Sequence, residues 1–119
     1  MEQQTILIVD DDREIVRVIA KILELEGYRT LKAYDGLEAL DMLVGNVVHL
    51  IMIDIMMPKM NGLGAVMKIR EINNIPIIIL SAKTEETDKV LGLSMGADDY
   101  ISKPFNTQEM IARVKSQLR

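Results

Sequence analysis

The sequence predicts an α/β domain in which five parallel strands alternate with helices. Three short apolar runs are rich in β-branched residues and do not alternate with polar ones, which suits strands covered on both faces. These runs are Ile6–Val9, Leu50–Ile53 and Ile77–Leu80. Helical patterns lie between them, and right-handed crossovers then place helices on both faces of one doubly wound sheet.

Two further strands complete the predicted sheet. The segment Tyr28–Tyr34 alternates more and carries Arg29 and Lys32, a polarity that an edge strand tolerates. Tyr100–Ile101 is a short fifth candidate. With 119 residues, the chain fits one compact domain over residues 1–119.

Helices are predicted between the strands from apolar residues at helical spacing. The first begins with Asp11 or Asp12 as its N-cap and stops at Gly27, and the last begins with the capping box Asn106–Glu109. The segment Glu85–Met95 is the least amphipathic of the set. The residues that follow the spacing in the other four helices are Ile15, Val18, Ile19, Ile22 and Leu23; Leu37, Leu40, Leu43 and Val44; Leu63, Val66, Met67 and Arg70; and Met110 or Ile111, Val114 and Leu118.

Composition narrows the classes of function. The net charge of −4 provides no general attraction to nucleic acid, and no basic tract occurs. The absence of cysteine excludes disulfides and thiolate metal sites, so a metal here must bind oxygen or the one histidine, His49. No apolar run approaches the roughly 18 residues that cross a bilayer, and the first residues lack the features of a signal peptide. A cytoplasmic protein without a membrane partner is therefore predicted.

Acidic, hydroxyl and amino side chains follow the predicted strands at one edge of the sheet. Asp10 and Asp11 follow the first strand, Asp54 the third, Ser81 the fourth and Lys103 the fifth. Ligands bind at the carboxyl ends of parallel strands, so we expect these side chains to gather in one crevice. Grouped carboxylates raise one another's pKa unless a cation joins them, and Mg²⁺ is the hard ion that prefers such oxygens.

With a metal bound, Asp54 is a candidate nucleophile, because aspartyl phosphates are established covalent intermediates. Each signal has a simpler interpretation when it is taken alone. Asp10–Asp12 suits a helix cap, and Asp54 suits a turn. Their occurrence together with Ser81 and Lys103, each at its own strand end, favours a phosphoryl-transfer site.

Five motifs occur in order along the chain: Asp10–Asp12, Asp54–Pro58, Asn61–Gly62, Leu80–Lys83 and Gly96–Phe105. Together, and at this spacing, they resemble the receiver domain of two-component response regulators over nearly the whole chain. The resemblance implies a CheY-like, flavodoxin-like (βα)5 fold with the strand order 2-1-3-4-5.

The same resemblance implies a role for each residue of the acidic crevice. Asp54 is the phosphoacceptor, Asp11 binds Mg²⁺ directly, and Asp10 binds it mainly through water. The backbone carbonyl of Met56 is a further ligand to the metal.

Three more roles follow from the resemblance. Ser81 is the switch hydroxyl, Tyr100 is the switch aromatic residue, and Lys103 binds the phosphoryl group. In the family, the peptide bond between this lysine and the following Pro104 is usually cis, which suits a tight turn.

Within the family, the segment Gly96–Tyr100 and the charges around it are similar to the OmpR/PhoB-type transcription factors. When phosphorylated, those proteins dimerise through the face made by the fourth helix, the fifth strand and the fifth helix. Pairs such as Lys89 with Glu109 and Asp99 with Arg113 are expected between subunits. The residues that match this face are Lys89, Asp98, Asp99, Glu109, Arg113 and Lys115.

The resemblance further implies a sensor histidine kinase as partner, and a DNA-binding domain that follows this regulatory part in a longer protein. It predicts a signalling domain that assists its own phosphorylation and dephosphorylation, and not a turnover enzyme. A stand-alone CheY-like regulator that acts by protein contact is the alternative. Two further alternatives are a phosphohydrolase and a pseudo-receiver, which binds protein but never takes phosphate. A phosphohydrolase generally needs a second acid where Met56 stands. A pseudo-receiver would not need the complete set of Asp10, Asp11, Asp54, Ser81 and Lys103.

Overall fold

One parallel sheet organises the chain in the computed structural model, which describes residues 3–57, 62–82, 90 and 93–119. The strand order β2-β1-β3-β4-β5 confirms the predicted topology and places β2 at an edge. The strands are β1 (Thr5–Val9), β2 (Arg29–Ala33), β3 (Leu50–Ile53), β4 (Ile77–Ser81) and β5 (Asp99–Ser102). The helices within the described ranges are α1 (Arg13–Leu25), α2 (Gly36–Leu43), α3 (Gly62–Ile72) and α5 (Thr107–Gln117).

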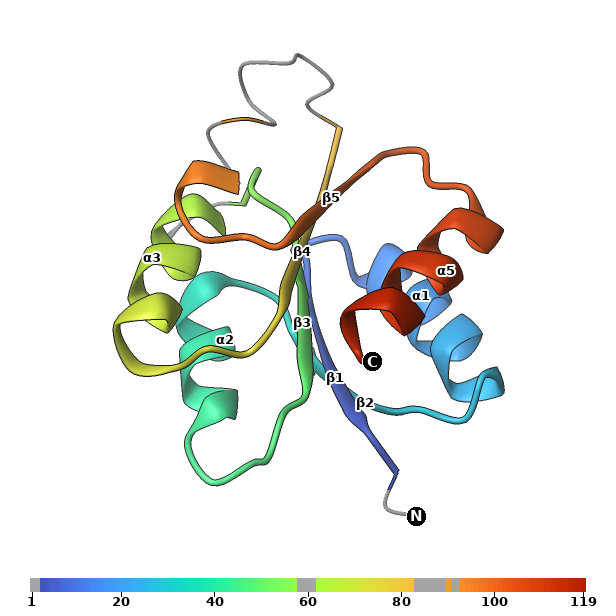
Figure 1. The fold of residues 1–119 in the computed structure, drawn as a ribbon, viewed down its shortest axis with the longest axis horizontal. Helices are drawn as coiled ribbons and strands as arrows, with labels where there is room; N and C mark the ends of the chain where they lie inside the picture. Colours follow the sequence, from blue (N-terminus) through green and yellow to red (C-terminus); the bar gives the residue numbers. More distant parts are fainter. Residues whose placement is uncertain (1–2, 58–61, 83–89, 91–92) are drawn as a thin grey trace.

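Helices cover both faces of the sheet, with α2 and α3 on one side and α1 and α5 on the other (Figure 1). Successive side chains of a strand point to opposite faces. In β1, Leu7 and Val9 therefore belong to the core under α2 and α3, whereas Ile6 and Ile8 belong to the core under α1 and α5. Burial on both faces explains why the sequences of β1, β3 and β4 are almost continuously apolar.

Local signals define where the helices begin and end. Asp12, one of the two predicted caps, accepts hydrogen bonds from the backbone N–H groups of Glu14 and Ile15 at 3.0 and 3.3 Å. Gly27 follows α1 with φ +95°, a conformation that favours glycine at a helix end. Asn106 accepts the N–H of Glu109 at 2.9 Å and caps α5 as predicted.

The predicted helix stripes were partly wrong about which face is buried. Small residues, namely Ala20 in α1, Ala39 in α2 and Ala65 in α3, are fully or almost fully buried instead. A small side chain lets a helix approach the sheet closely, so the larger neighbours are displaced to the flanks of the contact. The predicted stripe residues that are exposed by 40% or more are Val18, Leu37, Val44 and Met67.

The fourth predicted helix, Glu85–Met95, lies mostly outside the described residues. Val90, Leu93 and Ser94 are described, and they are helical. In the described ranges, no helix has the length and apolar character that crossing a membrane requires.

Arg70, near the end of α3, joins three segments on the side of α2 and α3. Its guanidinium donates to the carbonyls of Gly96 at 2.8 Å and Ile75 at 2.7 Å, and to the carboxylate of Asp98 at 2.7 Å. The same Asp98 oxygen accepts the N–H of Ile77 at 2.8 Å. Arg70 therefore fixes the end of α3 against the start of β4 and the approach to β5.

We predict that Gly96→Ala destabilises the fold more than Gly45→Ala. Both glycines have a positive φ, which costs an L-residue about 1–2 kcal/mol. A Cβ at Gly96 would also lie 2.8 Å from Cγ of Arg70, whereas a Cβ at Gly45 meets nothing within 4 Å. Urea unfolding of both variants measures the difference, which we expect to be about 1 kcal/mol or more. Equal losses would show that the Arg70 contact is unimportant.

Candidate functional site

The carboxyl ends of β1 and β3 bring two aspartates side by side. Val9 and Ile53 are partners in the parallel register, so Asp10 and Asp54, the next residues, are neighbours. Both are buried, with 1% and 4% of their surfaces exposed, whereas Asp11 is exposed. One carboxylate oxygen from each of Asp10, Asp11 and Asp54 lies within 4.8 Å of the others. The expected acidic crevice is therefore present.

Lys103 lies between the two buried carboxylates. Its Nζ is 2.7 Å from Oδ2 of Asp10 and 3.0 Å from Oδ2 of Asp54. The lysine follows β5, and its backbone N–H donates to the carbonyl of Ser81 at 2.8 Å. The Lys103–Pro104 peptide bond is cis, as the resemblance implies. Residues from three strand ends thus form one charged cluster.

Backbone amides hold the remaining oxygens of these carboxylates. Oδ1 of Asp10 accepts the N–H of Asp12 at 3.0 Å, and Oδ1 of Asp54 accepts the N–H of Met56 at 2.8 Å. Each buried carboxylate therefore has one oxygen bound by the backbone and one by Lys103. This arrangement fixes both groups before any ligand arrives.

Burial and charge act in opposite directions on the titration of the cluster. Burial raises the pKa of Asp10 above its usual value, although the hydrogen bond from Lys103 opposes this shift. Burial would lower the pKa of Lys103, but its hydrogen bonds to Asp10 and Asp54, together with the negative charges of both, outweigh that effect and raise it. Lys103 is therefore protonated at neutral pH.

The donor set suits a small, hard divalent cation. Octahedral Mg²⁺ binds oxygens at about 2.0–2.1 Å, which separates opposite ligands by roughly 4.2 Å. The three carboxylate oxygens, all within 4.8 Å of one another, are close enough to be candidate ligands of one ion. With all three ionised, they and Lys103 carry two net negative charges, which one such ion neutralises.

Ser81 and Tyr100 lie on neighbouring strands on the side of α2 and α3. Ile79 and Tyr100 are register partners, and Ser81 is two residues beyond Ile79 on the same face. Ser81 is fully buried, and 3% of Tyr100 is exposed. Ser81 and Tyr100 are therefore diagonal neighbours on one face of the sheet, because the register partner of Ser81 is Ser102.

Comparison with known proteins identifies the family. Residues 6–115 match the response regulator receiver domain. The chain belongs to this family. This receiver domain is 46% identical over 114 residues to the transcriptional regulatory protein CpxR of Escherichia coli K12, covering 96% of the chain and 49% of CpxR. It is 47% identical over 116 residues to the response regulator GtcR of Aneurinibacillus migulanus, covering 98% of the chain and 48% of GtcR.

The receiver domain spans about half the length of the curated relatives it matches. Solved structures agree with its fold along almost its full length. The receiver domain of the Francisella response regulator 1452 is 39% identical with a TM-score of 0.92, covering 98% of this chain and 97% of that one. A two-component response regulator from Clostridium difficile is 32% identical with a TM-score of 0.95, with the same coverage.

Most residues expected on the dimer face form ion pairs within this receiver domain. Arg113 is 2.8 Å from Asp99 and 3.4 Å from Glu109. Asp98 pairs with Arg70, as described above, and Lys115 is 3.1 Å from Glu26 on α1. Lys89 lies outside the described residues. Their participation between subunits therefore stays a prediction, and the expected Asp99–Arg113 pair is formed inside one chain.

Gly62 supports the site in a way that the sequence analysis missed. It begins α3 and is buried against the backbone that follows β3. A Cβ at Gly62 would lie 2.1 Å from the carbonyl oxygen of Asp54 and 2.4 Å from Cα of Ile55. Only a residue without a side chain allows this approach. The Asn61–Gly62 motif marks the position, but only the fold reveals its neighbour.

We predict that Gly62→Ala weakens Mg²⁺ binding, because the added methyl group must displace the backbone that carries Asp54. Overpacking of this kind typically costs about 1–3 kcal/mol of stability as well. Isothermal titration with Mg²⁺ and urea unfolding measure the two effects. Gly96→Ala, which strains a turn outside the acidic cluster, is the matched control and should lose stability while keeping its affinity. Unchanged affinity in Gly62→Ala would contradict the prediction.

Proposed function

We propose that Asp54 accepts a phosphoryl group from a sensor histidine kinase in a Mg²⁺-dependent reaction. The observation that carries the proposal is the buried Asp54 carboxylate, fixed by the N–H of Met56 and by Lys103 beside Asp10 and Asp11. An oxygen of Asp54 forms a bond to phosphorus as the bond from phosphorus to the kinase histidine breaks, and the histidine leaves. Such transfers depend on positioning and charge neutralisation more than on proton transfer.

The residues around Asp54 divide the work of this transfer. Asp10, Asp11 and the Met56 carbonyl would hold Mg²⁺ together with Asp54. When bound, the ion supplies positive charge to the oxygens of the transferred group. Lys103 already reaches Asp54, so it needs only a short movement to donate to a phosphoryl oxygen.

The negative charge of the phosphoryl group drives the proposed switch of Ser81 and Tyr100. A phosphoryl group brings about two negative charges into a site that two buried carboxylates already occupy. The Ser81 hydroxyl would move toward the new oxygens, and Tyr100 would turn into the space that it leaves. Their position on one face of neighbouring strands supports this coupling. The phosphoryl group then biases a population of two states toward the dimerising form.

The proposed output is transcriptional regulation through a dimer. CpxR is named as a transcriptional regulatory protein, and it is about twice the length of this chain's match. We infer that this receiver domain regulates an attached DNA-binding domain in the cytoplasm, and that DNA contact belongs to that domain. A stand-alone regulator is the second candidate, because the chemotaxis response regulator CheY4 of Vibrio cholerae is matched over 100% of its length at 29% identity.

The proposal assigns a signalling role and not turnover of small phosphate esters. Met56 stands two residues beyond Asp54, where phosphohydrolases that form an aspartyl phosphate generally have a second acid. Lys103 and Ser81 assist gain and loss of the phosphoryl group on Asp54 itself. Multiple turnover on small esters would instead favour the hydrolase.

Incubation with acetyl phosphate and Mg²⁺ should add one phosphoryl group to the protein, detected by intact mass. We predict that Asp54→Asn and Asp54→Ala abolish the addition, because the nucleophilic oxygen or the whole carboxyl group is gone. Asp12→Asn is the matched control, since it removes an exposed carboxylate but keeps a good N-cap. The proposal fails if either Asp54 variant still gains a phosphoryl group.

Beryllofluoride with Mg²⁺ mimics the bound phosphoryl group and should drive the protein toward a dimer in sedimentation equilibrium. We predict that Arg113→Ala weakens this dimer by up to about fivefold, as each exposed ion pair is worth at most about 1 kcal/mol. Arg17→Ala, which removes an exposed pair with Glu14 on α1, should not change it. A dimer that responds no more to Arg113→Ala than to Arg17→Ala would contradict this prediction.

A further inference from the structure

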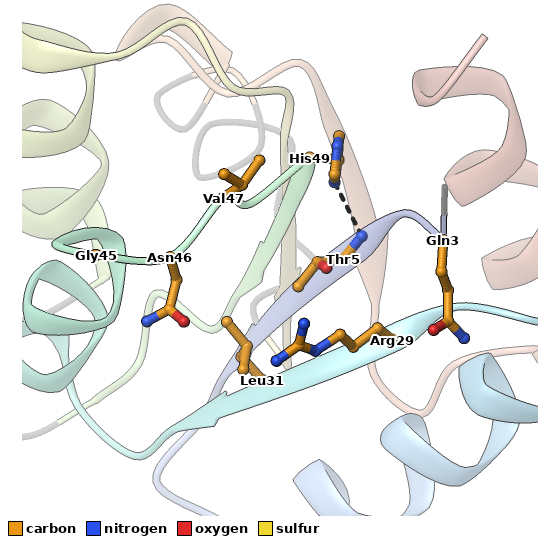
Figure 2. A pocket seen from close by; sticks show the side chains of 8 residues that line it. All are labelled: Gln3, Thr5, Arg29, Leu31, Gly45, Asn46, Val47 and His49. Atoms are coloured by element: carbon orange, nitrogen blue, oxygen red, sulfur yellow. Dashed lines mark hydrogen bonds between the residues drawn. The ribbon is translucent and has the colours of Figure 1, made fainter. Parts of the chain in front are cut away.

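A cavity of about 530 Å³ lies at the amino end of the sheet, opposite the acidic cluster. Its walls come from the first residues of β1 and β2 and from the segment between α2 and β3. Figure 2 shows the side chains that surround it. The volume falls in the range of about 300–1,000 Å³ that is typical of pockets for small molecules.

The sheet register explains why this cavity is open. Thr5 and Arg29 are register partners, and the N–H of His49 donates to the carbonyl of Thr5 at 2.8 Å. Two residues further along the three strands, on the same face, lie Leu7, Leu31 and Ile51 of the core under α2 and α3. The cavity therefore lies at the row of Thr5, Arg29 and His49, just outside this core. Helix α2 ends before it and leaves a loop as its far wall.

Arg29 gives the cavity a positive charge that no described carboxylate neutralises. Arg17, Arg70 and Arg113 each pair with an acidic side chain, whereas Arg29 has no such partner among the residues that the structure describes. None of the described residues that line the cavity is acidic. A guanidinium presents a planar fork of donors that matches a carboxylate or a phosphate through two parallel hydrogen bonds.

The other walls are held in place and combine polar groups with apolar surface. Nδ1 of His49 accepts the N–H of Thr5 at 2.9 Å, so the neutral ring carries its hydrogen on Nε2, which remains a donor (Figure 2). The amide of Asn46 is tied to the carbonyl of Met42 at 2.9 Å. Leu31 and Val47 add apolar contacts. The site thus offers one cation, fixed polar groups and room for a short hydrocarbon body.

We propose that this cavity binds a small organic oxyanion, either a carboxylate or a phosphate monoester, with Arg29 on the anionic group and Leu31 and Val47 on the apolar part. The site lies at the opposite ends of the strands from Asp54, so it is separate from the proposed phosphorylation. An interaction of this size and exposure corresponds to a dissociation constant on the order of 1 mM.

The test is an NMR titration of ¹⁵N-labelled protein without Mg²⁺, using three probes of similar shape: isobutyrate, isopropyl phosphate and the neutral isobutyramide. We expect saturable shifts of the Arg29, Asn46 and His49 signals with at least one anion, and none with the amide. Binding of isobutyrate alone identifies a carboxylate site, and binding of isopropyl phosphate alone identifies a phosphate site.

Arg29→Gln should reduce the affinity by about tenfold or more, as hydrogen bonds to a charged group are lost. Arg29→Lys keeps the charge but not the fork and should give an intermediate affinity. Because Arg29 is exposed at a sheet edge, both variants should fold, and thermal unfolding checks this. Three results would each overturn the proposal: no saturable shifts, equal binding of isobutyramide, or unchanged affinity in Arg29→Gln. Shifts confined to Asp54 and Lys103 would overturn it as well.

Discussion

The contact of Lys103 with two buried carboxylates is the interaction on which the site depends. Two acids at the ends of adjacent strands repel each other, and burial makes their charges costly. The single ammonium, within hydrogen-bonding distance of both, compensates for part of this cost. The ammonium does not balance the negative charge of the cluster, however, because the carboxylate of Asp11 is close by as well. The protein therefore keeps a cluster of negative charge that suits the divalent cation we propose for it.

The parallel sheet makes such a site possible with residues that are far apart in sequence. Asp10 and Lys103 are brought together because every strand ends at the same edge. The hydrogen bond from the backbone N–H of Lys103 to the carbonyl of Ser81 holds the lysine in place. Gly62 adds a second requirement, since α3 starts directly against the backbone of Asp54. The backbone that carries Asp54 is thus in direct contact with α3, which covers one face of the sheet.

Sequence patterns predicted the strands and the gathering of Asp10, Asp54 and Lys103, because apolar runs and strand-end residues reflect local rules and one topological rule. The strand order came from the family resemblance. Helix orientation was predicted less well. The pattern gave weight to large residues such as Val18 and Met67, whereas close packing on a sheet selects alanine. Interactions that depend on the distance between segments could not be read from spacing. The contact of Gly62 with the backbone at Asp54 belongs to this class, as does the charge of Arg29, which has no ion-pair partner in the part of the chain that the structure describes.

The contacts of Arg70 restrict which residues this part of the fold accepts. One planar guanidinium donates to three carbonyls and a carboxylate, in directions that a flexible ammonium cannot serve at once. Lys68 on the same helix is exposed and is not held by packing in this way. Arg70 and Asp98 are expected to vary only together, so this corner of the domain should drift more slowly than the surface around it.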